Sequence, residues 1–376
     1  MPKIDWIVET GSTQLTNYVM SMNIVGGREK YLDTYSGGTC VITFTNNNLV
    51  SALTYGTKII VRNGIGPTYI TLNFWVQEIV FDDHPGNVGL NTATVTCVDF
   101  MSRAGRINAN ALVLAQNSTV VQATKFNSSE GGPIPSDMTV GGYGSLGSSI
   151  ASATTYTGSV NNYLNLLVVT ERGYLYERAG LLVFVARPDA AAVTPPATTL
   201  GRTTSSTQIA YQTFERIQNG TQFINTATID PEGLAEQTVV NSTSVSAYGP
   251  ASYSSSTVDY TTTQATGNGQ WVVNNFGDPS ALRFACTFTD RMQNSTALDS
   301  WVSEFWGLTA SKSITLSYQI PGDSLTTITV IAEGYEINAT PEQTTFRFTF
   351  SPLQYYQFFT LNSSTLGILD TSRLGW

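Results

Sequence analysis

The sequence predicts a mainly β protein, built from antiparallel β-barrel or sandwich domains with small α+β insertions. Short runs of β-branched and aromatic residues recur along the chain, separated by turn clusters rich in Asn, Asp, Pro and Gly. Hydrophobic residues make up 41% of the 376 residues, so the chain can bury a substantial core. This length exceeds that of one ordinary domain and predicts two or three.

The first hundred residues supply four expected strands. Thr39–Thr45 is stopped by three consecutive asparagines, and Thr57–Arg62 is closed by an Asn-Gly turn. The long strand Tyr69–Phe81 ends sharply at a polar turn, and Thr92–Phe100 returns antiparallel to it. Closely spaced strands of this kind are typical of a barrel or a sandwich.

The middle of the chain differs in character. Ser, Gly, Thr and Pro dominate from Asn127 to Thr157, where we expect a long loop or loosely ordered excursion. Apolar residues then recur at spacings of three and four from Val160 to Val168, which predicts a short helix capped by Gly173. The run from Tyr174 to Val185 predicts a β-hairpin.

The last part of the chain is expected to be β again. The Ala/Pro/Thr-rich stretch Asp189–Thr199 is the best candidate for an interdomain linker. Strands are expected at 221–229, 313–320, 328–337 and 344–350, and a short helix is expected near 298–306.

An internal echo links the two halves of the chain. Trp75–Ile79, followed by a turn and the strand 94–100, resembles Glu333–Ile337, followed by a turn and the strand 344–350. The echo favours a structural repeat, although any β protein can show such a pattern by chance.

Composition argues against several functional classes. Charged residues make up only 12% of the chain, about half the usual share of roughly 25%, and the net charge of −9 argues against binding to nucleic-acid backbones. The single histidine, His84, leaves no His-rich metal site and few routes to a Ser-His or Cys-His pair. Cys40, Cys97 and Cys286 fit no zinc spacing; reduced thiols are expected, with a Cys40–Cys97 disulfide left open. No signal peptide and no run of 18 apolar residues is found, so we expect no membrane span.

Two short motifs have weak claims to ligand binding. Gly142–Gly147 matches the glycine pattern of dinucleotide sites, but its flanks predict neither the strand nor the helix that such a site needs, so a flexible loop is expected. Asp82, Asp83 and His84 are possible metal ligands, yet adjacent strand residues point to opposite faces, and the following Pro-Gly explains them as a turn. We therefore assign no catalytic, cofactor-binding or metal residue.

Two further sets of side chains are ambiguous. Paired carboxylates for glycoside cleavage can be chosen from the acids, but no spacing singles out a pair. The tryptophans can serve as sugar-stacking platforms, but their apolar patterns favour the core or a subunit interface. The two sets are Glu171, Glu177, Asp299 and Glu304, and Trp6, Trp75, Trp271, Trp301, Trp306 and Trp376.

Several segments resemble the phage tail hub and minor tail protein family, in chain order. Trp6, Asn23–Arg28 and Tyr35–Asn46 are similar to its start, where a short strand ending in Gly-Arg precedes a strand closed by Asn. Gly56–Arg62 is similar to the family's next strand. Later matching pieces are 158–164, 171–187, Tyr248-Gly249-Pro250, Gln264-Ala265, Trp271 and 358–369. The stretch 127–157 departs from the family pattern.

The resemblance implies two tail-tube-like β-barrel domains in one chain. The first is expected in residues 1–105, and an insertion with the Gly/Ser-rich loop, short helix and hairpin in 106–190. A linker at 191–207 leads to a second β-rich region in 208–376, which includes the second tube-like domain and the helix near 298–306.

In function, the resemblance implies a non-enzymatic structural hub at the distal end of a phage tail, without a cofactor. Homotrimers of such hubs form a pseudo-sixfold ring between the tail tube and the tip. Expected partners are the tail tube or distal tail protein, the tape measure protein, and tail tip spike or fibre proteins. DNA is expected to pass through the channel without specific binding, and the acidic balance agrees with this because like charge repels phosphate.

The expected location is the tail tip of the virion, after assembly in the host cytoplasm. The low charge suits a surface that is largely covered by neighbours. The alternative is a carbohydrate-binding adhesin, that is, a receptor-binding tail protein using exposed aromatic side chains. A peptidoglycan-degrading tail enzyme is the least favoured reading, because no nucleophile, metal site or acid pair stands out.

Overall fold

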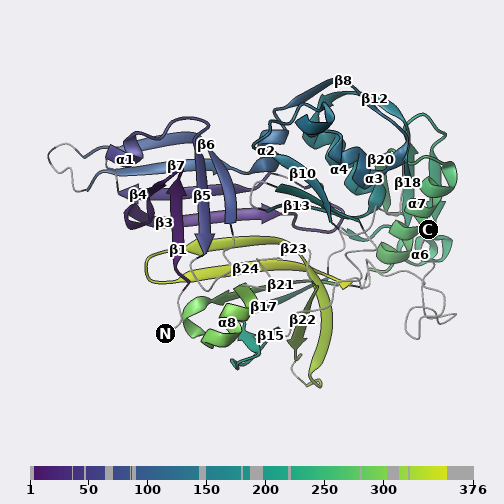
Figure 1. Cartoon of the computed structure of the whole chain (residues 1–376). Coiled ribbons are helices and arrows are strands. Elements are labelled where there is room, and N and C mark those ends of the chain that lie inside the picture. Colours follow the sequence, from purple (N-terminus) through teal and green to yellow (C-terminus); the bar gives the residue numbers. More distant parts are fainter. Residues whose placement is uncertain are drawn as a thin grey trace.

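The structure is a computed structural model that describes residues 4–35, 37–45, 48–63, 71–84, 86, 90–143, 150–178, 181–186, 198–218, 222–279, 282–302, 313–320 and 322–353. Figure 1 shows a large curled sheet, built from both ends of the chain, beside a body of shorter strands and helices built from its middle. The mainly β prediction is confirmed, and the described strands of the large sheet follow an open path rather than closing a barrel.

The N-terminal part of the large sheet holds seven strands in the order β3-β4-β7-β6-β5-β1-β2, with antiparallel neighbours. Inward-facing residues alternate with half-exposed ones along β4 and β5, as expected for strands with one buried face. The bounds are β1 Trp6–Thr10, β2 Thr13–Gln14, β3 Val19–Gly27, β4 Thr39–Thr45, α1 Asn48–Ser51, β5 Lys58–Asn63, β6 Thr71–Asp82 and β7 Thr92–Val98.

The C-terminal part of the same sheet runs β17-β21-β24-β23-β22-β15-β16. Its first five strands are antiparallel neighbours, whereas β15 pairs in parallel with both β22 and β16. The bounds are β15 Thr199–Gly201, β16 Gln208–Ala210, β17 Thr213–Gln218, β21 Leu282–Thr289, α8 Ser295–Trp301, β22 Ser313–Tyr318, β23 Thr326–Ala339 and β24 Thr344–Pro352.

The two parts repeat one another strand by strand. The series β3, β4, β7, β6, β5 corresponds to β17, β21, β24, β23, β22, and a short helix follows the second strand of each set in the chain (α1 and α8). Each hairpin contains one register shift, at Gln77 in β6 and at Glu333 in β23. When the two bulges are aligned, the opposed pair Lys58 and Trp75 of the first set corresponds to the opposed pair Ser313 and Ile331 of the second. The neighbouring pairs correspond in the same way.

Sequence identity supports this alignment in one place. Thr43–Thr45 on β4 and Thr287–Thr289 on β21 occupy equivalent positions, and both read Thr-Phe-Thr. The echo in the sequence thus falls on two equivalent hairpins. The sequence pattern aligned Trp75 with Glu333, whereas the bulges align Gln77 with Glu333, a difference of two residues.

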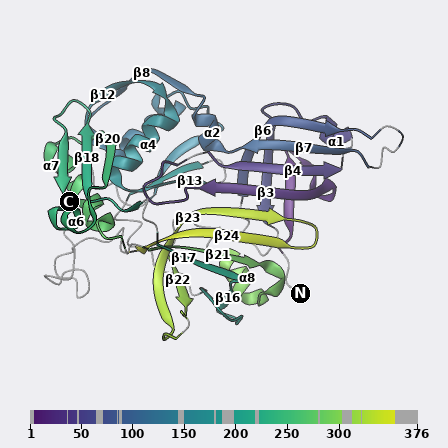
Figure 2. The same ribbon diagram turned by 180° about the vertical axis from the view of Figure 1, so that it is seen from behind.

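The middle body interrupts this repeat at two points. One insertion follows β7 and contains α2, β8 to β14, α3 and α4; the other lies between β17 and β21 and contains β18 to β20, α6 and α7. In Figure 2, seen from behind, both insertions lie together on one side of the large sheet. The bounds are α2 Phe100–Ala104, β8 Asn108–Leu114, β9 Asn117–Ser118, α3 Thr119–Thr124, β10 Thr139–Tyr143, β11 Ile150–Ala151, β12 Thr154–Ser159, α4 Val160–Glu171, β13 Tyr174–Arg178, β14 Leu181–Val185, β18 Thr226–Pro231, β19 Gln237–Val240, α6 Ser242–Tyr248, β20 Ser252–Thr257 and α7 Thr262–Phe276.

Two hydrophobic cores follow this division. The first core lies within the large sheet, where it joins the N-terminal strands to the C-terminal strands, and it includes Trp301 and Phe346. The second joins the two insertions and includes Tyr163, Phe184 and Phe276. Each core therefore draws on segments from both halves of the sequence. The expected domain boundaries after residues 105, 190 and 207 stay a prediction.

Part of the stretch 127–157, expected as a loop, is ordered as strands. β10 pairs in parallel with β14, and β12 pairs with β8. The Asn127 side chain accepts from the backbone N–H of Val140 at 2.7 Å and donates to its carbonyl at 2.8 Å, which satisfies the backbone of β10. The loop prediction was wrong here because pairing with distant strands, which composition does not show, satisfies the backbone.

Three other local expectations also change. The helix at 160–171 and the following hairpin are confirmed, but the residue at the left-handed helix end is Arg172, with φ 55°, rather than Gly173. The helix α7, 15 residues long, was missed because Thr and Gln dominate its exposed and half-buried positions, and because Gly and Asn take several of its buried positions in place of large apolar residues. Most of the expected linker 189–199 lies outside the described residues.

Candidate functional site

The described parts of the metal and nucleotide candidates do not come together as a site. Asp82, Asp83 and His84 are exposed at the end of β6, and no cluster of three or more metal-ligating side chains exists within the described part of the chain. Gly142 and Tyr143 belong to strand β10 rather than to a flexible loop, and the rest of the Gly142–Gly147 motif lies outside the described residues.

The three candidate acids that the structure describes lie on different elements. Glu171 is buried at the end of α4 and accepts a hydrogen bond from the Thr119 hydroxyl at 2.9 Å. Glu177 is half-buried on β13, Asp299 is exposed on α8, and Glu304 lies outside the described residues. None of the described cavities is lined by these acids.

The cysteines are free thiols. Cys40 and Cys97 lie directly opposite one another on β4 and β7, and Cys286 is buried on β21. Burial raises the pKa of Cys97 to about 12 and raises the pKa of Cys40 well above its ordinary value. Buried thiols of this kind behave as small hydrophobic groups rather than nucleophiles.

The described tryptophans lie mainly in the core. Trp75, Trp271 and Trp301 are buried, and Trp6 is half-buried with its indole N–H donated to the Thr344 hydroxyl at 3.0 Å. Trp306 and Trp376 lie outside the described residues. The preference for core over sugar-stacking platforms is confirmed for the buried three.

The feature that the structure does build is a junction between the two strand sets. The C-terminal half of β23 pairs antiparallel with β3, from Gly334 opposite Gly27 to Ala339 opposite Met22. Asn23 donates to the side chains of Asn338 at 2.7 Å and Glu336 at 3.1 Å across this pairing. The N-terminal half of β23 pairs instead with β22, so β23 changes partners at its bulge.

A buried ion pair lies at this change of partners. The Arg28 Nε donates to Glu333 Oε2 at 2.7 Å, and both side chains are almost fully buried. The guanidinium carbon is 4.6 Å from the ring centroids of Tyr31 and Tyr35 and 5.1 Å from that of Tyr174. Cation–π contacts of this kind strengthen when they are desolvated. Arg28 therefore contacts both Glu333 of the large sheet and Tyr174 of the middle body.

Glycines allow the two strands of the junction to approach closely. A Cβ at Gly27 would clash with the carbonyl oxygen of Glu333, and a Cβ at Gly334 would lie 2.6 Å from the carbonyl oxygen of Arg28. A groove of about 380 Å³ lies over the junction and is lined by residues of β3, β23 and β24 and of the segment 28–34 that follows β3. The expected Gly-Gly-Arg element therefore lies at this contact, but its partner Glu333 was missed. The one signal in the sequence is that this carboxylate directly follows the apolar residues 330–332.

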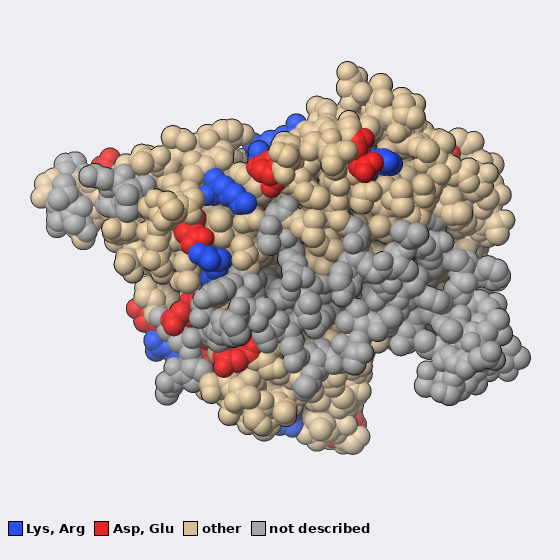
Figure 3. Space-filling view, in the orientation of Figure 1, with Lys and Arg blue, Asp and Glu red and all other residues tan. Residues whose placement is uncertain are grey.

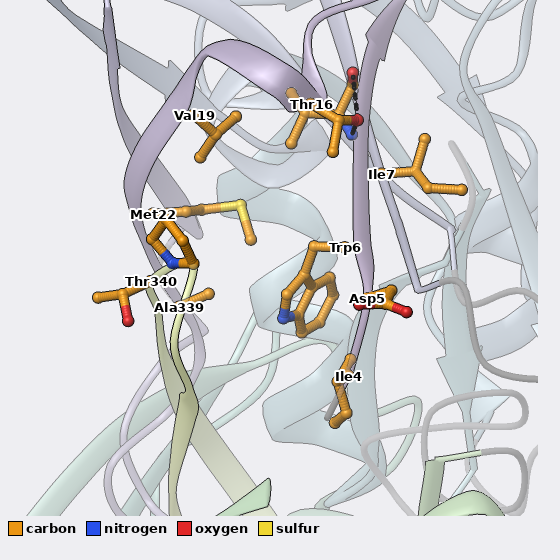
Figure 4. Close-up of a pocket in the computed structure, with 11 residues that line it drawn as sticks. Ile4, Asp5, Trp6, Ile7, Thr16, Val19, Met22, Ala339 and Thr340 are labelled. Atoms are coloured by element: carbon orange, nitrogen blue, oxygen red, sulfur yellow. Dashed lines mark hydrogen bonds between the residues drawn. The ribbon is translucent and has the colours of Figure 1, made fainter. Parts of the chain in front are cut away.

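A second groove opens at the far end of β3. This cavity has a volume of about 340 Å³, and Asp5 is among its lining residues. Figure 4 shows the Trp6 and Met22 side chains pointing toward one another, with Ala339 nearby. The lining is mostly apolar, with Asp5, Thr16 and Thr340 as its polar members, and the cavity lies between β1, β3 and the turn after β23. It has the character of a packing groove rather than of a catalytic pocket.

The surface is sparsely charged. On the face shown in Figure 3, Lys, Arg, Asp and Glu are scattered among uncharged side chains and form no large area of one sign. None of the helices in the described ranges is long and apolar enough to cross a membrane.

Comparison with solved structures identifies the fold. The chain matches the 43 kDa tail protein of prophage MuSo2 from Shewanella oneidensis, with a TM-score of 0.60 and 12% identity over 93% of this chain and 98% of that one. It also matches a tail protein from Neisseria meningitidis MC58, with a TM-score of 0.64 and 10% identity over 93% and 96% of the two chains. The chain has the fold of these tail proteins.

A third match is more distant. Prophage tail protein gp18 from Listeria monocytogenes EGD-e has a TM-score of 0.51 and 8% identity, over 92% of this chain and 94% of that one. No protein-family model and no curated protein sequence matches the chain. At these identities the likeness concerns the fold, which spans nearly the whole chain in all three cases.

Proposed function

We propose that this protein is a structural hub at the distal end of a phage tail, where it assembles as a homotrimer into a pseudo-sixfold ring. The observation that carries the proposal is the internal repeat: one chain contains two sets of five strands with the same order, direction and register. Three chains thereby supply six equivalent units. The fold of the tail proteins from Shewanella and Neisseria supports the same assignment.

Such a ring resolves a mismatch of symmetry. Its six equivalent units stack under a hexameric tail tube or distal tail protein, while the two inserted bodies differ between the halves and present threefold symmetry to spike or fibre proteins. The tape measure protein and then DNA occupy the channel. A net charge of −9 disfavours binding of phosphate to the channel wall.

The proposed role is architectural rather than enzymatic. The described carboxylates considered for hydrolysis lie on separate elements and line neither groove. The groove beside Trp6 is mostly apolar, and the groove over the junction is lined by glycines and by side chains of both charges. The protein is proposed to act at the tail tip of the virion through contacts with its neighbours.

Native mass spectrometry and negative-stain imaging of the purified chain test the proposal. We expect a trimeric ring with a central opening that stacks on tail-tube protein when the two are mixed. A chain that stays monomeric at high concentration, alone and with tail-tube protein, contradicts the proposal.

An adhesin role is the second candidate, favoured by three exposed tyrosines. Tyr55, Tyr248 and Tyr260 are 71%, 60% and 45% exposed. A glycan array separates the two functions: specific binding that is abolished by replacing one of these tyrosines with Ala favours the adhesin, whereas ring formation without glycan binding favours the hub.

A further inference from the structure

We propose that neighbouring copies of this chain join edge to edge through β6 of one copy and β17 of the next, in the register that β23 and β3 use within one chain. This inference rests on the proposed ring and names the surface that closes it. The pairing within the chain provides the template, because β23 corresponds to β6 and β3 corresponds to β17 in the internal repeat.

Both proposed edges lack a partner strand in the described structure. β5 pairs with β6 only over Thr71–Trp75, so no described strand lies beside the outer edge of β6 beyond the bulge. β17 pairs with β21 on one side and with no described strand on the other. Their counterparts beyond the bulge, β23 and β3, are hydrogen-bonded to one another.

The exposure of equivalent side chains differs between the two strand sets, as the proposed edge pairing predicts. Ile337 on β23 is fully buried beneath the junction, whereas Phe81 at the equivalent position of β6 is 43% exposed. Ile24 on β3 is likewise buried, whereas Arg216 at the equivalent position of β17 is exposed. Exposed apolar residues on an open strand edge are a template for pairing with another chain, and a second copy carries the matching edge.

The alignment of the bulges defines the register. Within the chain, Tyr335, Glu336 and Ile337 lie opposite Gly26, Val25 and Ile24. The equivalent pairs between two copies are Ile79 with Gln218, Val80 with Ile217, and Phe81 with Arg216.

The chemistry of these pairs is compatible with contact. Val80 and Ile217 are both β-branched and pair well across strands, and the guanidinium of Arg216 can lie over the ring of Phe81. In the first pair, Ile79 takes the place of Tyr335 and Gln218 takes the place of Gly26. Because Ile is smaller than Tyr, it leaves room for the Gln218 side chain. The next pair places Asp82 opposite Glu215, and since like charges in opposition are destabilising, we expect the pairing to end at Phe81.

Cysteine cross-linking tests the register directly. In the double variant Val80→Cys/Ile217→Cys, opposed Cα atoms about 4.5–5.5 Å apart allow a disulfide. Mild oxidation is expected to give covalent dimers and trimers on non-reducing gels, ending at the trimer. The native thiols are buried and their raised pKa values keep them unreactive, so they need not be removed.

Matched variants control the experiment. Val25→Cys/Glu336→Cys occupies the equivalent pair of the internal junction and is expected to form a disulfide within one chain, without dimers. The single variants Val80→Cys and Ile217→Cys are expected to give no covalent dimer; a dimer from either one indicates a face-to-face contact and overturns the proposal. Asp82→Asn removes the opposed charge and is expected to strengthen association several-fold, whereas Val80→Lys is expected to weaken it at least tenfold.

Native mass spectrometry of the same samples separates the two proposals. One outcome is a trimer in which the control variant Val25→Cys/Glu336→Cys cross-links and the variant Val80→Cys/Ile217→Cys stays unlinked. This outcome refutes the edge pairing and leaves the proposed ring intact. Cross-linked chains that extend beyond three copies support the edge pairing and contradict the closed trimer. Monomers without any cross-link between chains contradict both.

Discussion

Breaking the buried Arg28–Glu333 pair is expected to destabilise the protein strongly. Glu333→Met leaves the guanidinium of Arg28 buried, 2.7 Å from where its carboxylate partner lay, with three tyrosine rings around it. Removing one partner of a buried ion pair costs about 3–5 kcal/mol, because the remaining charge is then uncompensated. We therefore expect the free energy of unfolding to fall by about that amount in Glu333→Met and in Arg28→Met alike.

The double variant Arg28→Met/Glu333→Met distinguishes a charge effect from lost packing. Replacing a whole buried pair by apolar side chains is often close to neutral, so the double variant is expected to recover most of the loss. Equilibrium urea unfolding, followed by tryptophan fluorescence and by circular dichroism to test for two-state behaviour, measures all three. Single variants that each lose less than about 1 kcal/mol, or a double variant whose loss equals their sum, would refute the reasoning.

The remaining predictions concern the junction, a titrating helix cap and the core. Gly27 and Gly56 both have positive φ, 86° and 80°, but only at Gly27 does an added Cβ meet a backbone carbonyl, so Gly27→Ala is expected to lower the unfolding midpoint clearly more than Gly56→Ala in parallel urea titrations. Asp99 caps the N-terminus of α2 by accepting a hydrogen bond from the backbone N–H of Ser102 at 3.0 Å. Burial raises the pKa of Asp99 to about 6, so the folded state binds the extra proton and this carboxyl's contribution to stability is lost as pH rises from about 4 through 6. Asp99→Asn is therefore expected to gain stability relative to the parent over that range, and an unchanged difference between pH 4 and pH 7 would contradict the assignment. Trp301→Ala is expected to cost about 3–5 kcal/mol by opening a cavity, against less than about 0.5 kcal/mol for the exposed Met292→Ala in the same assay.

The strands were predictable from sequence where local pattern and tertiary pairing agree. The alternation in Thr39–Thr45 and the polar turns around the two hairpins indicated β4, β6, β7, β23 and β24, because one face of each strand is buried. α7 was hidden by its Thr, Asn and Gly content, and β10 by its glycines, since in both cases burial against distant elements outweighs local propensity.

The sequence by itself determined the class of the fold, the small share of charge and the recurrence of a hairpin in each half, because composition and alternation are local properties of the chain. Only the tertiary structure decided that β23 changes partners at Glu333, that Arg28 compensates that carboxylate, and that β6 and β17 are left with open edges. The reason is that strand register depends on which distant backbone groups pair, and a shift of one residue exchanges the two faces of a strand without changing its composition.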